Sequence, residues 1–243
     1  MNKILITGGF GYIGSKFLEK FSNDYEIVVM DNLLYGLKNQ INNLTHLKKD
    51  VRSIDKEDLK DIDYVLHLSE LSNDPLGEIN ENLTYSINHY ATKKLLDLCN
   101  ETKVSKFIYM SSCAVYGKNE KLVNEASETN PLTTYSKSKI LNENYILNNE
   151  FNFETTILRN ATVFGYSKNL RIDLVINELV YEAVFNRKIV LKSDGTPLRP
   201  FVHVEDLVNI INMLFVTSDK LDKEIINIGN INYSIKDIAK SIG

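Results

Sequence analysis

Two short segments near the middle of the chain carry the residues best suited to chemistry. One reads MSSCAVYG over residues 110–117, and the other reads YSKSK over residues 135–139. If the second segment is helical, Tyr135 and Lys139 share one face, because side chains four positions apart stack there. An ammonium beside a phenol, whose reference pKa is about 10, stabilises the phenolate. With the Ser112 hydroxyl holding the same substrate oxygen, these groups predict removal of a proton from an alcohol.

Proton removal is half of an alcohol oxidation, and the N-terminus predicts a site for the hydride acceptor. An apolar run suited to a buried parallel strand leads into the turn TGGFGYIG. Gly8, Gly11 and Gly14 permit a tight turn, close approach of a pyrophosphate and close packing of a helix. The pyrophosphate is expected at the helix N-terminus, beside Tyr12 and Ile13. The spacing is G-x-x-G-x-x-G, whereas simple dehydrogenases have G-x-G-x-x-G.

An acidic residue follows the second apolar strand. Residues 26–30 lead into Asp31, about twenty residues after the glycines, where a carboxylate accepts hydrogen bonds from an adenosine ribose. A carboxylate also repels a 2′-phosphate, so the sequence favours NAD over NADP. The alternative is that Asp31 caps a helix or turn. Asn32 follows it directly, and Asp50 and Val51, after a third predicted strand, are expected to bracket the adenine.

The composition is that of an ordinary globular protein. Of 243 residues, 43% are hydrophobic and 25% are charged, which is enough to bury a sizeable core. A net charge of -4 with dispersed Lys and Arg argues against a nucleic-acid partner. Apolar runs are short and a strand begins almost at once, so we expect no membrane span and no signal peptide. Cys99 and Cys113 form neither a metal nor a disulfide pattern, which favours a reducing cytoplasm and no metal.

Apolar strands alternate with helical stretches up to about residue 160. The predicted strands are 3–7, 26–30, 44–48, 64–68, 106–111 and 154–158, and the main helices are 83–99 and 135–149. Alternation of this kind predicts an α/β fold with a Rossmann-like doubly wound parallel sheet, which binds ligands at the carboxyl ends of its strands. The glycine turn, Asp31, Ser69, Ser112 and Thr162 all follow predicted strands, so one crevice can hold them.

The second half of the chain is less regular. We expect a helix over 173–186, a strand over 188–191, a last strand over 224–228, and a final helix capped by Ser234. The expected division is an NAD-binding domain over 1–164, to which 201–230 return, and a small C-terminal substrate-binding lobe from 165–200 and 231–243.

These segments together resemble the extended short-chain dehydrogenase/reductase family, in particular its NAD-dependent nucleotide-sugar epimerases and dehydratases of the UDP-glucose 4-epimerase type. The resemblance spans almost the whole chain and rests on TGGFGYIG, Asp31-Asn32, SSCAVYG, YSKSK and RPFVHVEDL. It implies NAD as cofactor and a nucleotide-diphosphate sugar as substrate. It also implies that Tyr135 is the catalytic acid/base, that Lys139 binds the nicotinamide ribose, and that Ser112 binds the reacting sugar oxygen.

The same resemblance implies roles for residues outside these motifs. Cofactor contacts are implied for Leu68, Ser69 and Asn88, and substrate contacts for Ser72, Thr162, Asn177 and Arg199. An arginine fork such as that of Arg199 is well shaped for a diphosphate. Segments 72–77 and 170–177 resemble a less characterised bacterial subgroup.

The resemblance further implies a homodimer, since family members commonly pair two helices per subunit. Here these would be 83–99 and 135–149, whose apolar residues beyond one core-facing stripe include Tyr90, Leu98, Ile140 and Ile146. Relatives usually continue for several tens of residues beyond this end, so we expect the substrate lobe to be truncated.

Three departures from the family pattern leave other activities open, and one of them is that Thr162 stands where many epimerases have asparagine. Family dehydratases have Asp then Glu after the catalytic hydroxyl residue, where this chain has Cys113 and Ala114. Dehydration is therefore disfavoured, although Glu125 or Glu128 could substitute. Glu70 stands where many members have alanine. The leading interpretation is an epimerase that acts through a 4-keto intermediate. One alternative is a reductase or dehydrogenase that uses the triad of Ser112, Tyr135 and Lys139. The other is a non-catalytic NAD-binding regulatory protein.

Overall fold

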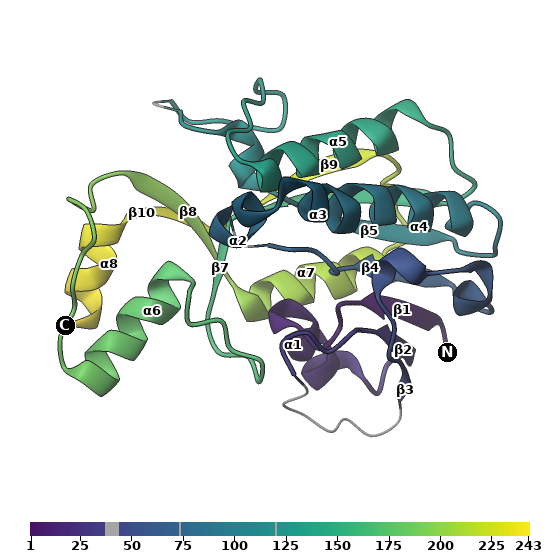
Figure 1. Ribbon diagram of the computed structural model, residues 1–243, viewed down its shortest axis with the longest axis horizontal. Coiled ribbons are helices and arrows are strands. Elements are labelled where there is room, and N and C mark those ends of the chain that lie inside the picture. Colours follow the sequence, from purple (N-terminus) through teal and green to yellow (C-terminus); the bar gives the residue numbers. More distant parts are fainter. Residues whose placement is uncertain (37–43, 73, 120) are drawn as a thin grey trace.

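A parallel sheet of seven strands lies at the centre of the computed structural model (Figure 1). The structure describes residues 1–36, 44–72, 74–119 and 121–243. Its strand order is β3-β2-β1-β4-β5-β6-β9, with all neighbours parallel. These strands are β1 (Lys3–Thr7), β2 (Glu26–Met30), β3 (Leu44–Leu47), β4 (Tyr64–His67), β5 (Lys106–Ser112), β6 (Glu154–Asn160) and β9 (Glu224–Ile228). The chain order reverses between β1 and β4, the place where such sheets bind ligands. The predicted α/β fold is confirmed.

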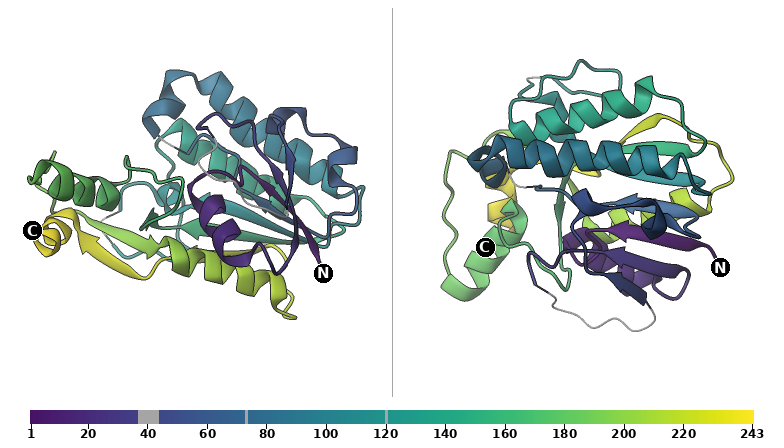
Figure 2. Two further views of the ribbon diagram at one scale, coloured as in Figure 1. Left: turned by 90° about the horizontal axis from the view of Figure 1, so that it is seen from below. Right: turned by 45° about the vertical axis from the view of Figure 1, so that its right-hand side comes forward.

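Helices cover both faces of this sheet (Figures 1 and 2). They are α1 (Tyr12–Phe21), α3 (Glu81–Tyr85), α4 (Ala91–Cys99), α5 (Thr134–Asn148) and α7 (Val204–Val216). Strand β1 shows why both faces are covered. Ile4 and Ile6 are buried in a cluster with α1 and α7, whereas Leu5 is buried in a cluster with α4 and α5, because side chains alternate along a strand.

The helix expected over 83–99 is a composite element. α3 runs into a π-helical segment, Ser86–Tyr90, which continues into α4. Segments of π-helix are rare and occur frequently at functional sites, and this one carries Asn88. The helix expected over 135–149 is α5. It begins one residue earlier, because Thr133 caps it by accepting a hydrogen bond from the Ser136 N–H at 3.1 Å.

A second, three-stranded sheet lies beside the first, in the order β10-β8-β7. It comprises β7 (Thr162–Phe164), β8 (Leu198–His203) and β10 (Ile231–Ser234), with β8 parallel to β7 and antiparallel to β10. α6 (Val175–Tyr181), its π-helical continuation Glu182–Asn186 and α8 (Ile235–Ile242) complete this lobe. Leu179, Phe201 and Ile238 form its small core. Ser234 caps α8 by accepting a hydrogen bond from the Asp237 N–H, as predicted.

Two expectations about local structure are wrong. The strand predicted over 188–191 is absent, because this stretch has no neighbouring strand: Ile189 and Leu191 pack on the lobe core while Val190 is exposed. Ile146, predicted to lie outside the core-facing stripe of α5, is fully buried in the cluster beneath α4 and α5. Within the segment 72–77, Asn73 lies outside the described residues.

Candidate active site

A cavity of about 1480 Å³ opens at the carboxyl ends of the large sheet and is lined by residues of both the sheet and the lobe. Most residues that the sequence pointed to lie on its wall. They are Gly8, Gly11, Tyr12, Ile13, Gly14, Asp31, Asn32, Asp50, Val51, Leu68, Ser69, Ser72, Ser112, Tyr135, Lys139, Thr162 and Arg199. Asn88 and Asn177 are not among the described lining residues. One cavity thus unites groups that the sequence separates by up to about 190 residues.

The glycine turn is packed so closely that two positions leave no room for a side chain. Gly8 has φ +66°, and a Cβ there would lie 2.9 Å from the Ser69 nitrogen. A Cβ on Gly14 would lie 2.4 Å from the Gly9 carbonyl oxygen. Gly11 precedes α1 and makes no side-chain cap, so N–H groups of the first turn are left for an anion. The turn therefore fits the pyrophosphate of a dinucleotide.

Asp31 lies at the end of β2, next to this turn. Its carboxylate accepts hydrogen bonds from the backbone N–H groups of Phe10, at 3.1 Å, and Leu33, at 2.8 Å. A carboxylate has about four acceptor sites, so two remain for ribose hydroxyls. Farther along the cavity, hydrogen bonds from Arg52 lower the pKa of Asp50 to about 2, so Asp50 is charged at neutral pH. This end of the cavity suits an adenosine.

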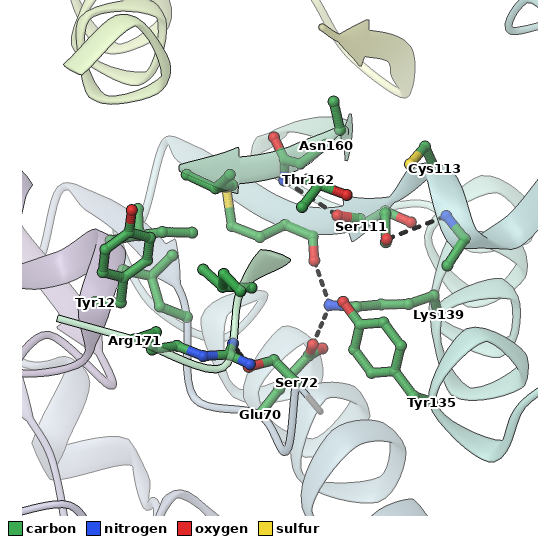
Figure 3. Close-up of a pocket in the computed structure, with 18 of the residues that line it drawn as sticks. Tyr12, Glu70, Ser72, Ser111, Cys113, Tyr135, Lys139, Asn160, Thr162 and Arg171 are labelled. Carbon is green, nitrogen blue, oxygen red and sulfur yellow. Dashed lines mark hydrogen bonds and ion pairs between the residues drawn. The ribbon is translucent and has the colours of Figure 1, made fainter. Parts of the chain in front are cut away.

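Tyr135 and Lys139 lie side by side on α5, with both side chains in the cavity (Figure 3). Lys139 Nζ lies 5.3 Å from the centroid of the Tyr135 ring and 5.0 Å from that of Tyr109. The ammonium donates to the carbonyl oxygen of Met110 and to the carboxylate of Glu70. Burial is the largest single influence on the pKa of Lys139 and lowers it, but the charge and hydrogen bond of Glu70, together with Tyr135 and Glu143, outweigh burial and raise the pKa. Lys139 is therefore an ammonium beside a phenol.

Ser112 is the last residue of β5, and its Oγ accepts a hydrogen bond from the Ala114 N–H at 3.1 Å. The strand end is held from behind by a buried ion pair. Ser111 Oγ donates to Glu143 at 2.5 Å, and Arg159 Nη2 donates to the same carboxylate at 2.6 Å. These residues lie on β5, α5 and β6. The ion pair therefore fixes the end of β5, and with it Ser112, relative to α5 and β6.

Asn88 and Asn177 support the cavity wall from behind. The Asn88 side chain accepts a hydrogen bond from the Leu71 N–H at 2.8 Å and donates to the Leu71 carbonyl oxygen at 3.1 Å. The Asn177 side chain accepts from the Gly165 N–H at 3.0 Å and donates to the Tyr12 hydroxyl at 3.4 Å. Both amides thus bind other residues of the protein. Two of these partners, Leu71 and Tyr12, line the cavity.

Two arginines face the cavity from the lobe side. Arg199 on β8 is exposed and has no ion-pair partner among the described residues. Arg171, which sequence reasoning did not single out, donates from Nη1 to Ser72 Oγ at 2.8 Å and from Nη2 to Asp173 at 2.5 Å (Figure 3). The only signal for Arg171 in the sequence was its place in the segment 170–177. Spacing alone could not bring that loop to the cavity.

The described residues contain two cysteines, one of which lies on the cavity wall. Cys99 and Cys113 are free thiols, and burial raises the pKa of Cys113, which lines the cavity, to about 11. In the ranges that the structure describes, no three His, Cys, Asp or Glu side chains are grouped as metal ligands would be. Within those same ranges, no helix combines the length and apolar character that crossing a membrane requires.

Comparison with known proteins links this geometry to a family. The model of the NAD dependent epimerase/dehydratase family matches residues 4–229. A Methanocaldococcus jannaschii protein provisionally named a UDP-glucose 4-epimerase is 33% identical, over 93% of this chain and 76% of its own length. Human dTDP-D-glucose 4,6-dehydratase is 31% identical, over 99% of this chain and 73% of its own length.

Comparison with solved structures leads to the same family. The fold is similar to that of UDP-N-acetylglucosamine 4-epimerase from Methanobrevibacter ruminantium M1 in complex with UDP-N-acetylmuramic acid, with a TM-score of 0.89 and 27% identity. That match covers 98% of this chain and 80% of the other. The resemblance to extended short-chain dehydrogenases/reductases is thereby confirmed. The chain belongs to the NAD-dependent epimerase/dehydratase family.

Proposed function

We propose that this protein is an NAD-dependent epimerase of a nucleotide-diphosphate sugar. The observation that carries the proposal is that Tyr135, Lys139 and Ser112 line the same cavity as the glycine turn and Asp31. The cavity has an end suited to a dinucleotide, at Asp31, and an end suited to a second diphosphate, at Arg199. A redox cofactor and a sugar nucleotide can therefore lie in it together.

Tyr135, Lys139 and Ser112 each have one task in this reaction. Tyr135 takes the proton from a ring hydroxyl, most simply that at C4, and the Lys139 ammonium stabilises the phenolate that accepts it. Ser112 holds the same oxygen in place. NAD held by the glycine turn and Asp31 would supply the hydride acceptor for that carbon and the hydride donor for the opposite face of the 4-keto sugar. Proton transfer by a positioned group contributes roughly 10²- to 10⁴-fold to the rate.

Dehydration is the second candidate, because a dehydratase is among the similar proteins. It requires one group to protonate the leaving hydroxyl and another to remove a proton beside the ketone. The positions after Ser112 carry a protonated thiol, Cys113, and Ala114. Glu125 and Glu128 are not among the described lining residues, and the Glu125 carboxylate accepts a hydrogen bond from the Asn227 N–H at 2.8 Å. These observations favour epimerisation.

The test is to incubate the protein with NAD and a panel of UDP-, GDP- and dTDP-sugars while following NADH absorbance and identifying products by NMR. An epimerase interconverts two sugars with transient NADH and no net change in redox state. Stoichiometric NADH release would indicate a dehydrogenase, NADH consumption a reductase, and a 4-keto-6-deoxy product a dehydratase. NAD binding without turnover of any sugar would indicate a regulatory protein.

We also propose that different parts of the chain bind the cofactor and the substrate. Residues 1–164 and 201–230 would bind NAD, and residues 165–200 and 231–243 would form part of the substrate lobe. Support comes from β9, which joins the large sheet, and from α7, which packs against α1 in the core of that sheet. Ser167, Asn169 and Asn177 bond to Phe10 or Tyr12 of the glycine turn. Exchange of the lobe residues other than these three should therefore change sugar preference and leave NAD affinity unchanged.

For assembly, we propose a homodimer formed through the composite helix α3–α4 and α5. Leu83, Tyr90 and Leu141 on these helices are 39%, 64% and 41% exposed, which gives an apolar surface for a second copy. A monomer by light scattering at micromolar concentration would contradict this.

Because Cys99 and Cys113 are free thiols, we place the protein in a reducing cytoplasm.

A further inference from the structure

The ion pair of Glu70 and Lys139 is a feature of the cavity that the epimerase mechanism above does not require. The two side chains are only 5% and 3% exposed, and they are in direct contact (Figure 3). Burying a carboxylate is costly unless it is paired and hydrogen-bonded.

The Glu70 carboxylate is held in a fixed orientation. The Tyr109 hydroxyl donates to Glu70 Oε1 at 3.1 Å, and Asn142 Nδ2 on α5 donates to that hydroxyl oxygen at 2.8 Å. The backbone is fixed as well, because Asn88 binds both the N–H and the carbonyl oxygen of the next residue, Leu71. Glu70 is therefore held in place by side chains from β5, α5 and the π-helical segment.

The contacts of Lys139 leave one donor over. An ammonium has three N–H groups, and here one donates to Glu70 and another to the carbonyl oxygen of Met110. The third remains for an acceptor in the cavity. Lys139 can thus bind a ribose hydroxyl without giving up either protein contact.

The pair also sets the local charge. Burial raises the pKa of Glu70, while the Lys139 ammonium and the Tyr109 hydroxyl oppose that rise. Two donors on the carboxyl oxygens favour the charged form. In its ion-paired form the site therefore contains a carboxylate charge directly beside the Lys139 ammonium.

We propose that Glu70 is a positioning residue that fixes the Lys139 ammonium and places a negative charge at the nicotinamide end of the cavity. This rests on the proposed function, because it takes Lys139 as the ligand of the nicotinamide ribose. The nicotinamide ring is a cation in NAD and neutral in NADH, so a nearby carboxylate favours the oxidised form. That bias returns the hydride to the sugar, as a reaction without net oxidation requires.

The test is calorimetric titration of NAD and of NADH, without sugar, into the wild-type protein and two variants. Glu70→Gln keeps the size and an acceptor oxygen but removes the charge. We expect it to raise the ratio of the Kd for NAD to the Kd for NADH by roughly tenfold. Glu70→Ala also releases Lys139, so it should change the ratio similarly and weaken binding of both forms. Glu101→Gln, which removes a carboxylate paired with Lys56 outside the cavity, is the matched control and should change neither.

An unchanged ratio in folded Glu70→Gln overturns the proposal, whatever Glu70→Ala does. If Glu70→Gln fails to fold, Glu70→Asp decides, since it keeps the charge and shortens the side chain. Weaker binding of both forms at the wild-type ratio supports the proposal, and any other result overturns it. Because no sugar is present, a wild-type protein that binds both cofactor forms but converts no sugar refutes the epimerase function and leaves this test valid.

Discussion

The Asp31 carboxylate accepts a hydrogen bond from the backbone N–H of Phe10 at 3.1 Å, which joins the end of β2 to the glycine turn after β1. A second bond, from the Gly8 N–H to the Met30 carbonyl oxygen at 2.7 Å, connects the same two loops. The loop suited to a ribose and the loop suited to a pyrophosphate are thus one unit, and a change at Asp31 acts on both.

Asp31→Asn is expected to weaken NAD binding and to reduce the preference for NAD over NADP. The amide keeps an acceptor oxygen for Phe10 but loses the charge that binds ribose hydroxyls and repels a 2′-phosphate. Because a hydrogen bond to a charged group is involved, the ratio of the two Kd values should change roughly tenfold. Calorimetric titration measures both. Asp24→Asn, on the exposed turn after α1, is the control, and equal effects of the two variants would contradict the assignment.

Tyr135→Phe is expected to reduce turnover by at least roughly 10²-fold while NAD still binds, because only the proton acceptor is lost. Tyr145→Phe provides a matched control on the same helix, where the Tyr145 hydroxyl binds Asp97 away from the cavity. Turnover is followed with whichever sugar the panel identifies. If both variants retain wild-type rates, Tyr135 is not the acid/base.

Arg199→Ala is expected to raise KM for the nucleotide sugar roughly tenfold, because a charged donor to the diphosphate is removed. NAD affinity should stay at the wild-type value, since Arg199 lies on the lobe side of the cavity. Arg187→Ala, on the far end of α6 and its continuation, is the control. A parallel loss of NAD affinity in Arg199→Ala would place this arginine at the cofactor instead.

His67 should make the protein less stable in mild acid. Its ring contacts the hydroxyls of Thr7 at 2.7 Å and Thr92 at 2.8 Å, and burial, together with the Lys139 charge, lowers its pKa to about 3. Between pH 6.5 and about 3 the unfolded chain therefore binds one more proton than the folded one, so stability falls as pH falls through this window. The contribution of this group should drop by about 2 kcal/mol between pH 6.5 and 5.

Urea unfolding of the wild type and His67→Gln at pH 7 and pH 5 measures this contribution. Carboxylates titrate in both proteins, so the comparison isolates the histidine. The variant should lose less stability between the two pH values than the wild type loses. Equal losses would show that His67 is not kept neutral by the fold.

Two glycine-to-alanine changes should have opposite effects on stability. Gly14→Ala places a Cβ 2.4 Å from the Gly9 carbonyl oxygen, so it should destabilise the protein by about 1–3 kcal/mol. Gly77 lies in the short helix α2 (Asp74–Ile79), where the nearest atoms to a new Cβ are 3.8 Å away on Thr84. Gly77→Ala should therefore stabilise by about 0.4–1 kcal/mol. Thermal unfolding measures both.

The parts of the site that the sequence predicted are those whose geometry is local. A turn of three glycines, an acid directly after a strand, and a tyrosine one helical turn before a lysine each define their own arrangement once the element forms. The sheet then brings them together, because parallel strands end at one edge. Tyr135, Lys139 and Asp31 accordingly lie in one cavity.

Features that depend on distant partners could not be predicted in this way. Glu70 and Lys139 are 69 residues apart, and only the packed structure shows that they pair. Asn177 resembled a ligand for the substrate, yet its amide binds Gly165 and Tyr12. The strands β7, β8 and β10 are three to six residues long and gain their stability from one another. No alternating pattern of sufficient length marks them.

Strand β8 passes into α7 without an intervening loop, since His203 ends the strand and Val204 begins the helix. Arg199 is thus joined by continuous regular backbone to a helix that packs against α1, the helix that starts at the glycine turn. The packing of α7 against α1 therefore links the position of Arg199 to that of the glycine turn and limits movement of one relative to the other. We expect the protein to select substrates by the length of the phosphate linkage. A nucleoside monophosphate sugar, shorter by one phosphate, should bind more weakly than its diphosphate counterpart in direct titration.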